Sequence, residues 1–149
     1  MSTLAINKKA KFNFQLLEEF EAGLVLTGQE VKSAKLGRMD LKGAFVSIKN
    51  GQVWIKKLYI APYHKAGHSL KNYEAEHDRK LLLKDKEIIY LTSKTQQKGL
   101  TIIPISVYTS RRIIKVKIAL VKGKKKFDKR ETIKKRDIER VMARKIKSF

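Results

Sequence analysis

The sequence predicts a mainly β fold, a small closed or partly closed barrel with flanking helices and a basic C-terminal tail. Apolar residues alternate with polar ones in several short runs, which is the period of a strand with one buried face. Asn50-Gly51 joins two of these runs and is typical of a two-residue hairpin turn. Strands and helices do not alternate as they do in a parallel sheet, so a barrel is favoured and a β-sandwich is the alternative.

The N-terminal region predicts two extended segments. Residues 1–10 are polar, and we expect them to be loosely held. Phe12, Phe14 and Leu16 alternate with polar residues and predict a strand. Extended character resumes over Phe20–Leu26, after two glutamates.

A helix is predicted to begin at Thr27, which is followed by Glu30 with the spacing of a capping box. Val31 and Ala34 would face the core. Gly37 fits the left-handed residue that ends such a helix.

The Asn50-Gly51 turn predicts a hairpin from Ala44–Lys49 and Gln52–Ile60. A two-residue turn pairs Lys49 with Gln52 and sets the register of the whole hairpin. Four apolar residues then share one face: Val46, Ile48, Val53 and Ile55. The other face carries Phe45 and Trp54, for which a second packing layer is favoured over base stacking.

Residues 62–78 are predicted to form a long loop. His64, His68 and His77 raise a metal hypothesis, but no convincing set of carboxylate and histidine ligands accompanies them. Solvated loop histidines are the favoured interpretation, and no metal or other cofactor is expected.

The second half of the domain predicts a strand at Lys80–Lys84, a helix over Asp85–Lys98 that ends at Gly99, and a strand pair. The paired strands are Thr101–Thr109, with Ile103, Ile105 and Val107 on one face, and Arg112–Val121, with Ile114, Val116, Ile118 and Leu120 on one face. Pro104 lacks a ladder donor, which places its strand at an edge or a bulge.

The charge predicts a polyanionic partner. The 149 residues include 35 Lys and Arg against 14 Asp and Glu, a net charge of +21. Residues 122–149 alone hold 13 basic and 4 acidic side chains. We therefore divide the chain into an RNA-binding domain at 1–121, with its core at about 8–121, and a basic tail at 122–149.

The tail predicts an amphipathic helix that orders fully against a partner. Asp128 and Glu131 have capping-box spacing. Apolar residues follow at helical intervals: Ile138, Val141, Met142, Ile146 and Phe149.

Several function classes find no support. The chain has no cysteine, no phosphate-binding glycine loop and no nucleophile elbow. We therefore expect that the protein is not an enzyme. A basic RNase that uses loop histidines is a minor alternative. No apolar run approaches the ~20 residues of a membrane span, and we expect a cytoplasmic protein.

Several sequence blocks resemble the bacterial family of transfer-messenger-RNA-binding proteins, also called SsrA-binding or small protein B. The resemblance covers nearly the whole chain, and its specificity lies in the order and spacing of the blocks. They are Asn7-Lys-Lys-Ala10; Phe20-Glu-Ala-Gly23; Leu26-Thr-Gly-Gln-Glu-Val-Lys-Ser33; Asn50-Gly51 with Val53-Trp54; Arg79-Lys-Leu-Leu-Leu83; Lys98-Gly99 through Pro104; and Lys122-Gly-Lys-Lys125 with Asp128-Lys-Arg-Glu131.

The resemblance implies an oligonucleotide-binding-type (OB-like) barrel and a non-enzymatic adaptor of trans-translation. Such a protein binds the tRNA-like part of transfer-messenger RNA (tmRNA) and helps to present it with elongation factor Tu. It enters a ribosome stalled on an mRNA without a stop codon, where its tail samples the decoding centre and the empty mRNA channel. We expect a monomer. A generic RNA-binding or ribosome-associated module is the alternative.

The resemblance also implies RNA-contact residues in the domain. Glu21 would accept from base or ribose donors, with a structural salt bridge as the alternative. Leu82 would contact RNA or shape the surface from beneath. Lys84 and Phe12 depart from frequent family residues, and Phe12 keeps the ability to stack. The full set is Lys9, Phe12, Glu21, Lys32, Leu82 and Lys84.

In the tail, the resemblance implies recognition of the decoding centre. Gly123 would turn the chain from barrel to arm, and Phe127 would stack on a ribosomal RNA base. The residues implied are Lys122, Gly123, Lys124, Lys125, Phe127, Asp128, Lys129 and Arg130.

Overall fold

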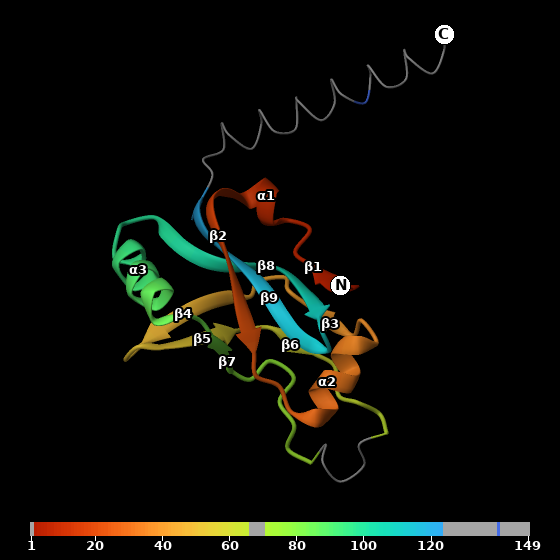
Figure 1. Cartoon of the computed structure of the whole chain (residues 1–149). Coiled ribbons are helices and arrows are strands. Elements are labelled where there is room, and N and C mark those ends of the chain that lie inside the picture. The colour runs from red at the N-terminus through yellow and green to blue at the C-terminus, as the bar shows by residue number, and fades with distance from the viewer. Residues whose placement is uncertain (1, 66–70, 124–139, 141–149) are drawn as a thin grey trace.

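The computed structural model describes residues 2–65, 71–123 and 140 (Figure 1). The strands are β1 (Ser2–Ile6), β2 (Phe14–Leu24), β3 (Met39–Asp40), β4 (Phe45–Lys49), β5 (Gln52–Lys56), β6 (Tyr59–Ile60), β7 (Arg79–Leu82), β8 (Leu100–Ser110) and β9 (Ile113–Gly123). The helices are α1 (Ala10–Asn13), α2 (Gly28–Lys35) and α3 (Asp85–Thr95). No helix of the described part is long and apolar enough to cross a membrane.

The main sheet closes on itself. Its seven strands run in the order β1-β8-β4-β5-β7-β2-β9, and β8 also pairs with β9. Every pairing is antiparallel. Strand β1 pairs only with β8 and lies outside the closed ring of the other six strands. Closure removes the exposed edges of an open sheet. The arrangement confirms the mainly β, barrel-type prediction over the sandwich.

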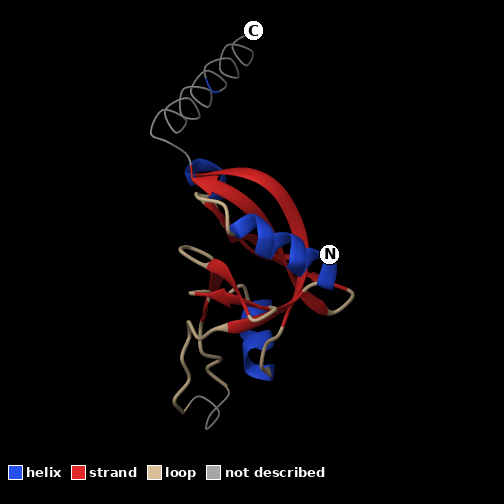
Figure 2. Ribbon diagram, turned by 90° about the vertical axis from the view of Figure 1, so that its left-hand side faces the viewer, coloured by secondary structure: helices blue, strands red, loops and turns tan. Residues whose placement is uncertain are grey.

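The barrel interior holds the main hydrophobic core. Strand residues that alternate toward the axis fill it, and Ala34 of α2 and Leu91 of α3 complete it. Figure 2 shows α1 and α2 at opposite ends of the barrel, with α3 on the side between them. A second cluster forms beside α1 from Ala10, Ile103, Ala119 and Val121.

The predicted hairpin is confirmed. Lys49 pairs with Gln52, and Phe45 pairs with Lys56, as the two-residue turn requires. Asn50 has φ 53° and Gly51 has φ 73°, so both turn residues are left-handed. The second strand is shorter than predicted, because the chain takes φ 60° at Lys57 and leaves the ladder.

The two helices predicted for the barrel domain are confirmed with small changes in length, whereas the apolar residues of the helix predicted for the tail lie outside the described residues. The Thr27 hydroxyl accepts the Glu30 backbone N–H at 3.4 Å, and the Glu30 carboxylate accepts the Thr27 N–H at 3.0 Å. Gly37 ends this helix with φ 74°. The later helix stops at Thr95, and the predicted stop residue Gly99 has φ 84°.

Three predictions for the N-terminal region were wrong. Ser2–Ile6 is not loose but forms β1, which pairs with β8, so the folded domain begins before residue 8. Phe12 lies in the short helix α1 rather than in a strand. The acidic pair does not interrupt β2, which bulges between Leu16 and Glu18 and continues to Leu24.

The predicted face of β8 was also wrong. The register shifts between Pro104 and Ser106, which confirms the bulge expected at Pro104 but reverses the alternation of side chains. Val107 therefore joins the barrel core, whereas Ile103 and Ile105 join the second cluster. The predicted face of β9 needs no correction, because Ile114, Val116, Ile118 and Leu120 all lie in the main core.

Candidate nucleic-acid interface

The structure brings Glu21, Leu82 and Lys84 together, although they are distant in sequence. Antiparallel pairing of β2 with β7 sets Gly23 opposite Leu82. A shallow depression of about 310 Å³ lies at this junction. It is lined by Glu21, Ala22, Gly23, Leu82, Leu83, Lys84, Glu87 and Lys115.

Glu21 forms a salt bridge and is still open to solvent. Lys115 Nζ lies 2.8 Å from its Oε1, and the Tyr108 hydroxyl donates to its Oε2. These hydrogen bonds, first from Lys115 and then from Tyr108, lower the pKa of Glu21. The side chain is 52% exposed, so the carboxylate is an ionised, oriented acceptor at the surface.

Leu82 lies on the surface rather than beneath it. The residue is 56% exposed, in contrast to its neighbour Leu81, which is 2% exposed and belongs to the core. A Cβ added at Gly23 would lie 3.3 Å from the Leu82 Cβ. The glycine therefore lets the leucine lie close across the two strands.

Lys84 immediately precedes α3 and is exposed. Its backbone N–H donates to the Glu87 carboxylate at 3.3 Å, which fixes the start of the helix. Lys84 therefore lines the depression from an ordered backbone position and adds positive charge there.

The other predicted RNA-binding residues do not join this cluster. Lys9 Nζ lies 5.6 Å from the ring centre of Phe12 at α1. Lys32 Nζ lies 5.5 Å from the ring centre of Tyr63 at α2. These two helices lie at opposite ends of the barrel (Figures 1 and 2), so the predicted set is divided among three places.

Lys115 and Tyr108 were not predicted as partners of Glu21. A signal for Lys115 was present, because Lys115 and Lys117 occupy the positions of β9 that alternate with its core residues. Strand β9 lies between β2 and β8, which brings Tyr108 opposite Lys115. Only this three-strand register joins the three side chains.

A buried polar network anchors the loop that precedes β7. Arg79 Nε donates to Glu30 Oε2 at 2.7 Å, and both residues are 1% exposed. His77 Nε2 lies 2.8 Å from the same oxygen, and the Tyr73 hydroxyl donates to it at 3.2 Å. The network therefore joins residues 73–79 to α2.

The metal hypothesis gains no support from the described residues. His77 is held by Glu30, and His64 Nδ1 lies 3.4 Å from an Arg38 guanidinium nitrogen. No group of at least three metal-ligating side chains occurs in residues 2–65 and 71–123. His68 lies outside the described residues.

The predicted tail begins inside β9. Lys122 pairs with Gln15 and Leu100, and Gly123 pairs with Phe14, so the strand runs two residues past the predicted boundary. The remaining predicted tail residues lie outside the described residues: Lys124, Lys125, Phe127, Asp128, Lys129 and Arg130.

The closed barrel, the charge of +21 and the exposed cluster at the β2–β7 junction define a basic β-barrel protein of the nucleic-acid-binding class. The model of one family, described as SmpB protein, matches residues 4–148. The chain belongs to the SmpB protein family.

Curated relatives match over almost their full length. The SsrA-binding protein of Coprothermobacter proteolyticus is 49% identical, over 97% of this chain and 96% of the relative. The SsrA-binding protein of Trichodesmium erythraeum is 45% identical, over 96% of this chain and 91% of the relative. A solved structure described as "tmRNA-SmpB: a journey to the center of the bacterial ribosome" is 39% identical, with a TM-score of 0.68 over 82% of this chain and 85% of that chain.

Proposed function

We propose that this protein is a non-enzymatic RNA-binding adaptor of trans-translation. It binds the tRNA-like domain of tmRNA and brings it to ribosomes stalled on mRNA that lacks a stop codon, which permits ribosome rescue and peptide tagging. The names of the relatives and of the solved complex support this assignment. Because it acts on ribosomes, the protein works in the cytoplasm.

The observation that carries the proposal is the cluster at the β2–β7 junction. Glu21 offers an acceptor for base or ribose donors, Leu82 offers an apolar surface, and Lys84 offers a phosphate partner. RNA presents hydroxyl donors and accessible bases where its helices end or loop. The cluster therefore suits a folded RNA better than a uniform duplex.

Two finer assignments belong to the proposal. The protein acts as a monomer and meets elongation factor Tu through the shared RNA. The tail from Lys124 onward, with Phe127 and Asp128-Lys-Arg130, enters the decoding centre and the empty mRNA channel. The density of lysines over residues 122–149 supports this role, because a channel of ribosomal RNA is lined by phosphates.

The second candidate function is a generic RNA-binding or ribosome-associated module. The charge of +21 favours it, because lysines bind phosphates without reading sequence. The two functions separate when the protein is purified from its host and the bound RNA is sequenced. We expect strong enrichment of tmRNA, whereas a mixed RNA population would favour the generic module.

A further inference from the structure

The tip of the β8–β9 hairpin carries two adjacent arginines in a strained backbone conformation. Ser110 pairs with Ile113, so Arg111 and Arg112 are the two residues of the turn. Arg111 has φ 50° and Arg112 has φ 67°, and both values lie in the left-handed region that residues with a Cβ atom avoid. A two-residue hairpin turn of this type needs positive φ at both positions, and asparagine and glycine adopt it with the least strain.

The hairpin of β4 and β5 has the same kind of turn without the strain. Asn50 and Gly51 connect these strands with φ 53° and φ 73°, close to the values of the two arginines. The two turns therefore have similar backbone angles and differ in the residues that adopt them. Backbone strain of this kind clusters at functional sites, which points to a role for the arginine side chains.

Contacts within the domain do not account for the two arginines. Both residues are exposed, and neither takes part in an ion pair within residues 2–65 and 71–123. Ile113 beside them is 57% exposed and belongs to neither hydrophobic cluster of the described residues. The tip is thus a cationic end of the barrel with an apolar neighbour, and both guanidinium groups can meet a partner.

Strand register places this tip beside the candidate RNA site. Lys115 lies opposite Gly23 of β2, and Gly23 lies opposite Leu82 of β7. Arg112 precedes Lys115 by three residues, which is about 10 Å along β9. Two strand spacings of ~4.8 Å separate β9 from β7, so the backbones of Arg112 and Leu82 are roughly 14 Å apart. A stacked nucleic-acid strand covers this distance in about four nucleotides, at ~3.4 Å each.

The tip and the candidate site also share one face of the sheet. Ile113 and Lys115 alternate along β9 with Ile114 and Val116, which lie in the main core. Lys115 is the residue that binds Glu21, with 2.8 Å between Nζ and Oε1. An RNA that lies over Glu21 can therefore continue to the hairpin tip along the outer face of β9.

The chemistry of the tip suits RNA phosphates. A guanidinium group presents a planar set of donors that matches two phosphate oxygens, and it stays charged at every physiological pH. Within the candidate site Glu21 already engages the Lys115 ammonium, which leaves Lys84 as the phosphate partner there. Two arginines at the tip add two further contacts to the RNA backbone.

We propose that Arg111 and Arg112 form a phosphate-binding pair that holds the backbone of the tRNA-like domain next to the Glu21 and Leu82 site. This inference rests on the proposed function, because it assumes that the tRNA-like domain occupies that site. It extends the RNA interface from the β2–β7 junction across β9 to the β8–β9 turn. The strained turn is kept because its arginines contact the RNA.

One variant of the full-length protein separates this role from a structural one. Arg111→Asn with Arg112→Gly copies the Asn50-Gly51 turn, so it relieves the strain while it removes both charges. The melting temperature should rise by about 2–4 °C. Binding to the tRNA-like domain should weaken by about tenfold, and the slope of log affinity against log salt should fall by about 1.5. A purely structural turn would not make stability and binding change in opposite directions.

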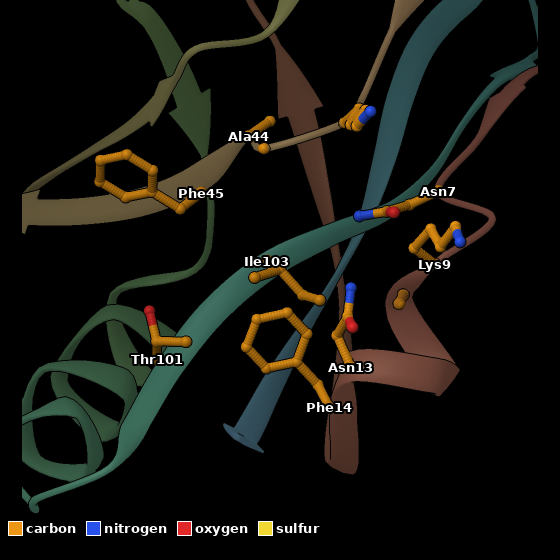
Figure 3. A pocket seen from close by; sticks show the side chains of 11 residues that line it. Asn7, Lys9, Asn13, Phe14, Ala44, Phe45, Thr101 and Ile103 are labelled. Atoms are coloured by element: carbon orange, nitrogen blue, oxygen red, sulfur yellow. The ribbon is translucent and has the colours of Figure 1, made fainter. Parts of the chain in front are cut away.

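Two control variants test charge and position. Arg111→Lys with Arg112→Lys keeps both the charges and the strain, so binding should stay within about threefold of wild type with the same salt slope. Lys42→Gln with Lys98→Gln removes two exposed charges at the other end of β8. That end borders a pocket of about 420 Å³, which Lys42 and Thr101 help to line (Figure 3). This control should weaken binding by less than about twofold.

Three results would overturn the proposal. They are unchanged binding in the Asn-Gly variant, equal weakening in the Lys42 and Lys98 control, and a loss in the Lys-Lys variant as large as in the Asn-Gly variant. Weakened binding to purified small subunits with intact binding to the tRNA-like domain would also contradict it. If the wild-type chain does not bind the tRNA-like domain, the proposed function fails. If the wild type and the Asn-Gly variant bind it equally, the arginine proposal alone fails.

Discussion

Arg79 donates from Nε to Glu30 Oε2 across 2.7 Å, and each of the two residues is only 1% exposed to solvent. The other guanidinium nitrogens donate to backbone carbonyls, including Ala75 at 2.9 Å and His77 at 3.3 Å. Arg79 belongs to β7, the strand that carries Leu82, and Glu30 belongs to α2. One ion pair therefore ties together a helix, a loop and the strand that presents the candidate RNA site.

Arg79→Met should lower the free energy of unfolding by about 3–5 kcal/mol, because it leaves the Glu30 carboxylate buried without its main partner. Urea unfolding followed by circular dichroism measures the change. The exposed pair of Lys117 with Glu19, at 3.6 Å, provides the control. Lys117→Met should cost at most about 1 kcal/mol, and equal losses in the two variants would contradict a special role for the buried pair.

Acid should weaken the fold partly through Glu30. Burial raises the pKa of this carboxyl, but hydrogen bonds from Thr27 and Arg79 and the Arg79 charge outweigh burial and lower the pKa below its ordinary 4.5. A lowered pKa stabilises the fold above pH 4.5, and this contribution is lost as the pH falls through the folded-state value.

The stability difference between wild type and Glu30→Gln should therefore be largest near neutral pH and shrink as the solution is acidified. Urea midpoints from about pH 7 to about pH 3 measure this difference. A difference that stays constant across the range would show that the ionised form of Glu30 contributes nothing.

Leu82→Glu should weaken binding of the tRNA-like domain by about tenfold or more, because it replaces an apolar contact with a charge that repels phosphate. Stability should change by less than about 0.5 kcal/mol, since the side chain is 56% exposed. Ile89→Glu on α3, at a residue 70% exposed, is the matched control. If Ile89→Glu weakens binding as strongly, general electrostatics explains the effect.

The Tyr108 hydroxyl should lose its proton at a higher pH than an ordinary tyrosine does. Burial first, and then the hydrogen bond to the Glu21 carboxylate and its negative charge, raise the pKa of Tyr108 to about 12. Glu21→Gln removes the charge and should bring the pKa of Tyr108 down toward 10.0. Ultraviolet absorbance of tyrosinate follows the titration, and a pKa that does not move would contradict the contact.

Truncation after Gly123 should leave binding to isolated tRNA-like RNA largely intact and abolish peptide tagging on stalled ribosomes. Ending the chain there preserves the pairing of Gly123 with Phe14. Gel-shift titration and an in vitro tagging assay measure the two activities. Loss of RNA binding would show that the proposed division between barrel and tail is wrong.

Local signals predicted much of this fold from the sequence alone. The Asn50-Gly51 turn, the capping box at Thr27 and the apolar period of β9 depend on neighbours within a few residues of each other. Such signals act through local backbone preferences and side-chain alternation, so they are visible in one dimension. Resemblance to a known family added the OB-like barrel type and named Glu21 and Leu82.

Contacts that join distant segments could not be predicted in this way. The sequence of Ser2–Ile6 contains only a weak strand pattern, and β1 forms because β4 pairs with β8 at one position only, which leaves Ser106–Thr109 of β8 available to it. The bulge beside Pro104 reverses the faces of β8 through a shift of one residue. Pro104 indicated an edge or a bulge, but neither the pairing of β1 nor the reversed faces of β8 has a counterpart in local propensity.

The candidate site shows the same division. The chain itself determined a basic protein with a carboxylate and an apolar residue in matching family blocks. Only the tertiary structure decided that Lys115 and Tyr108 hold Glu21, that Leu82 faces solvent, and that Lys9 and Lys32 lie elsewhere. The physical reason is strand register, which spacing along the sequence does not specify between strands that are far apart in the chain.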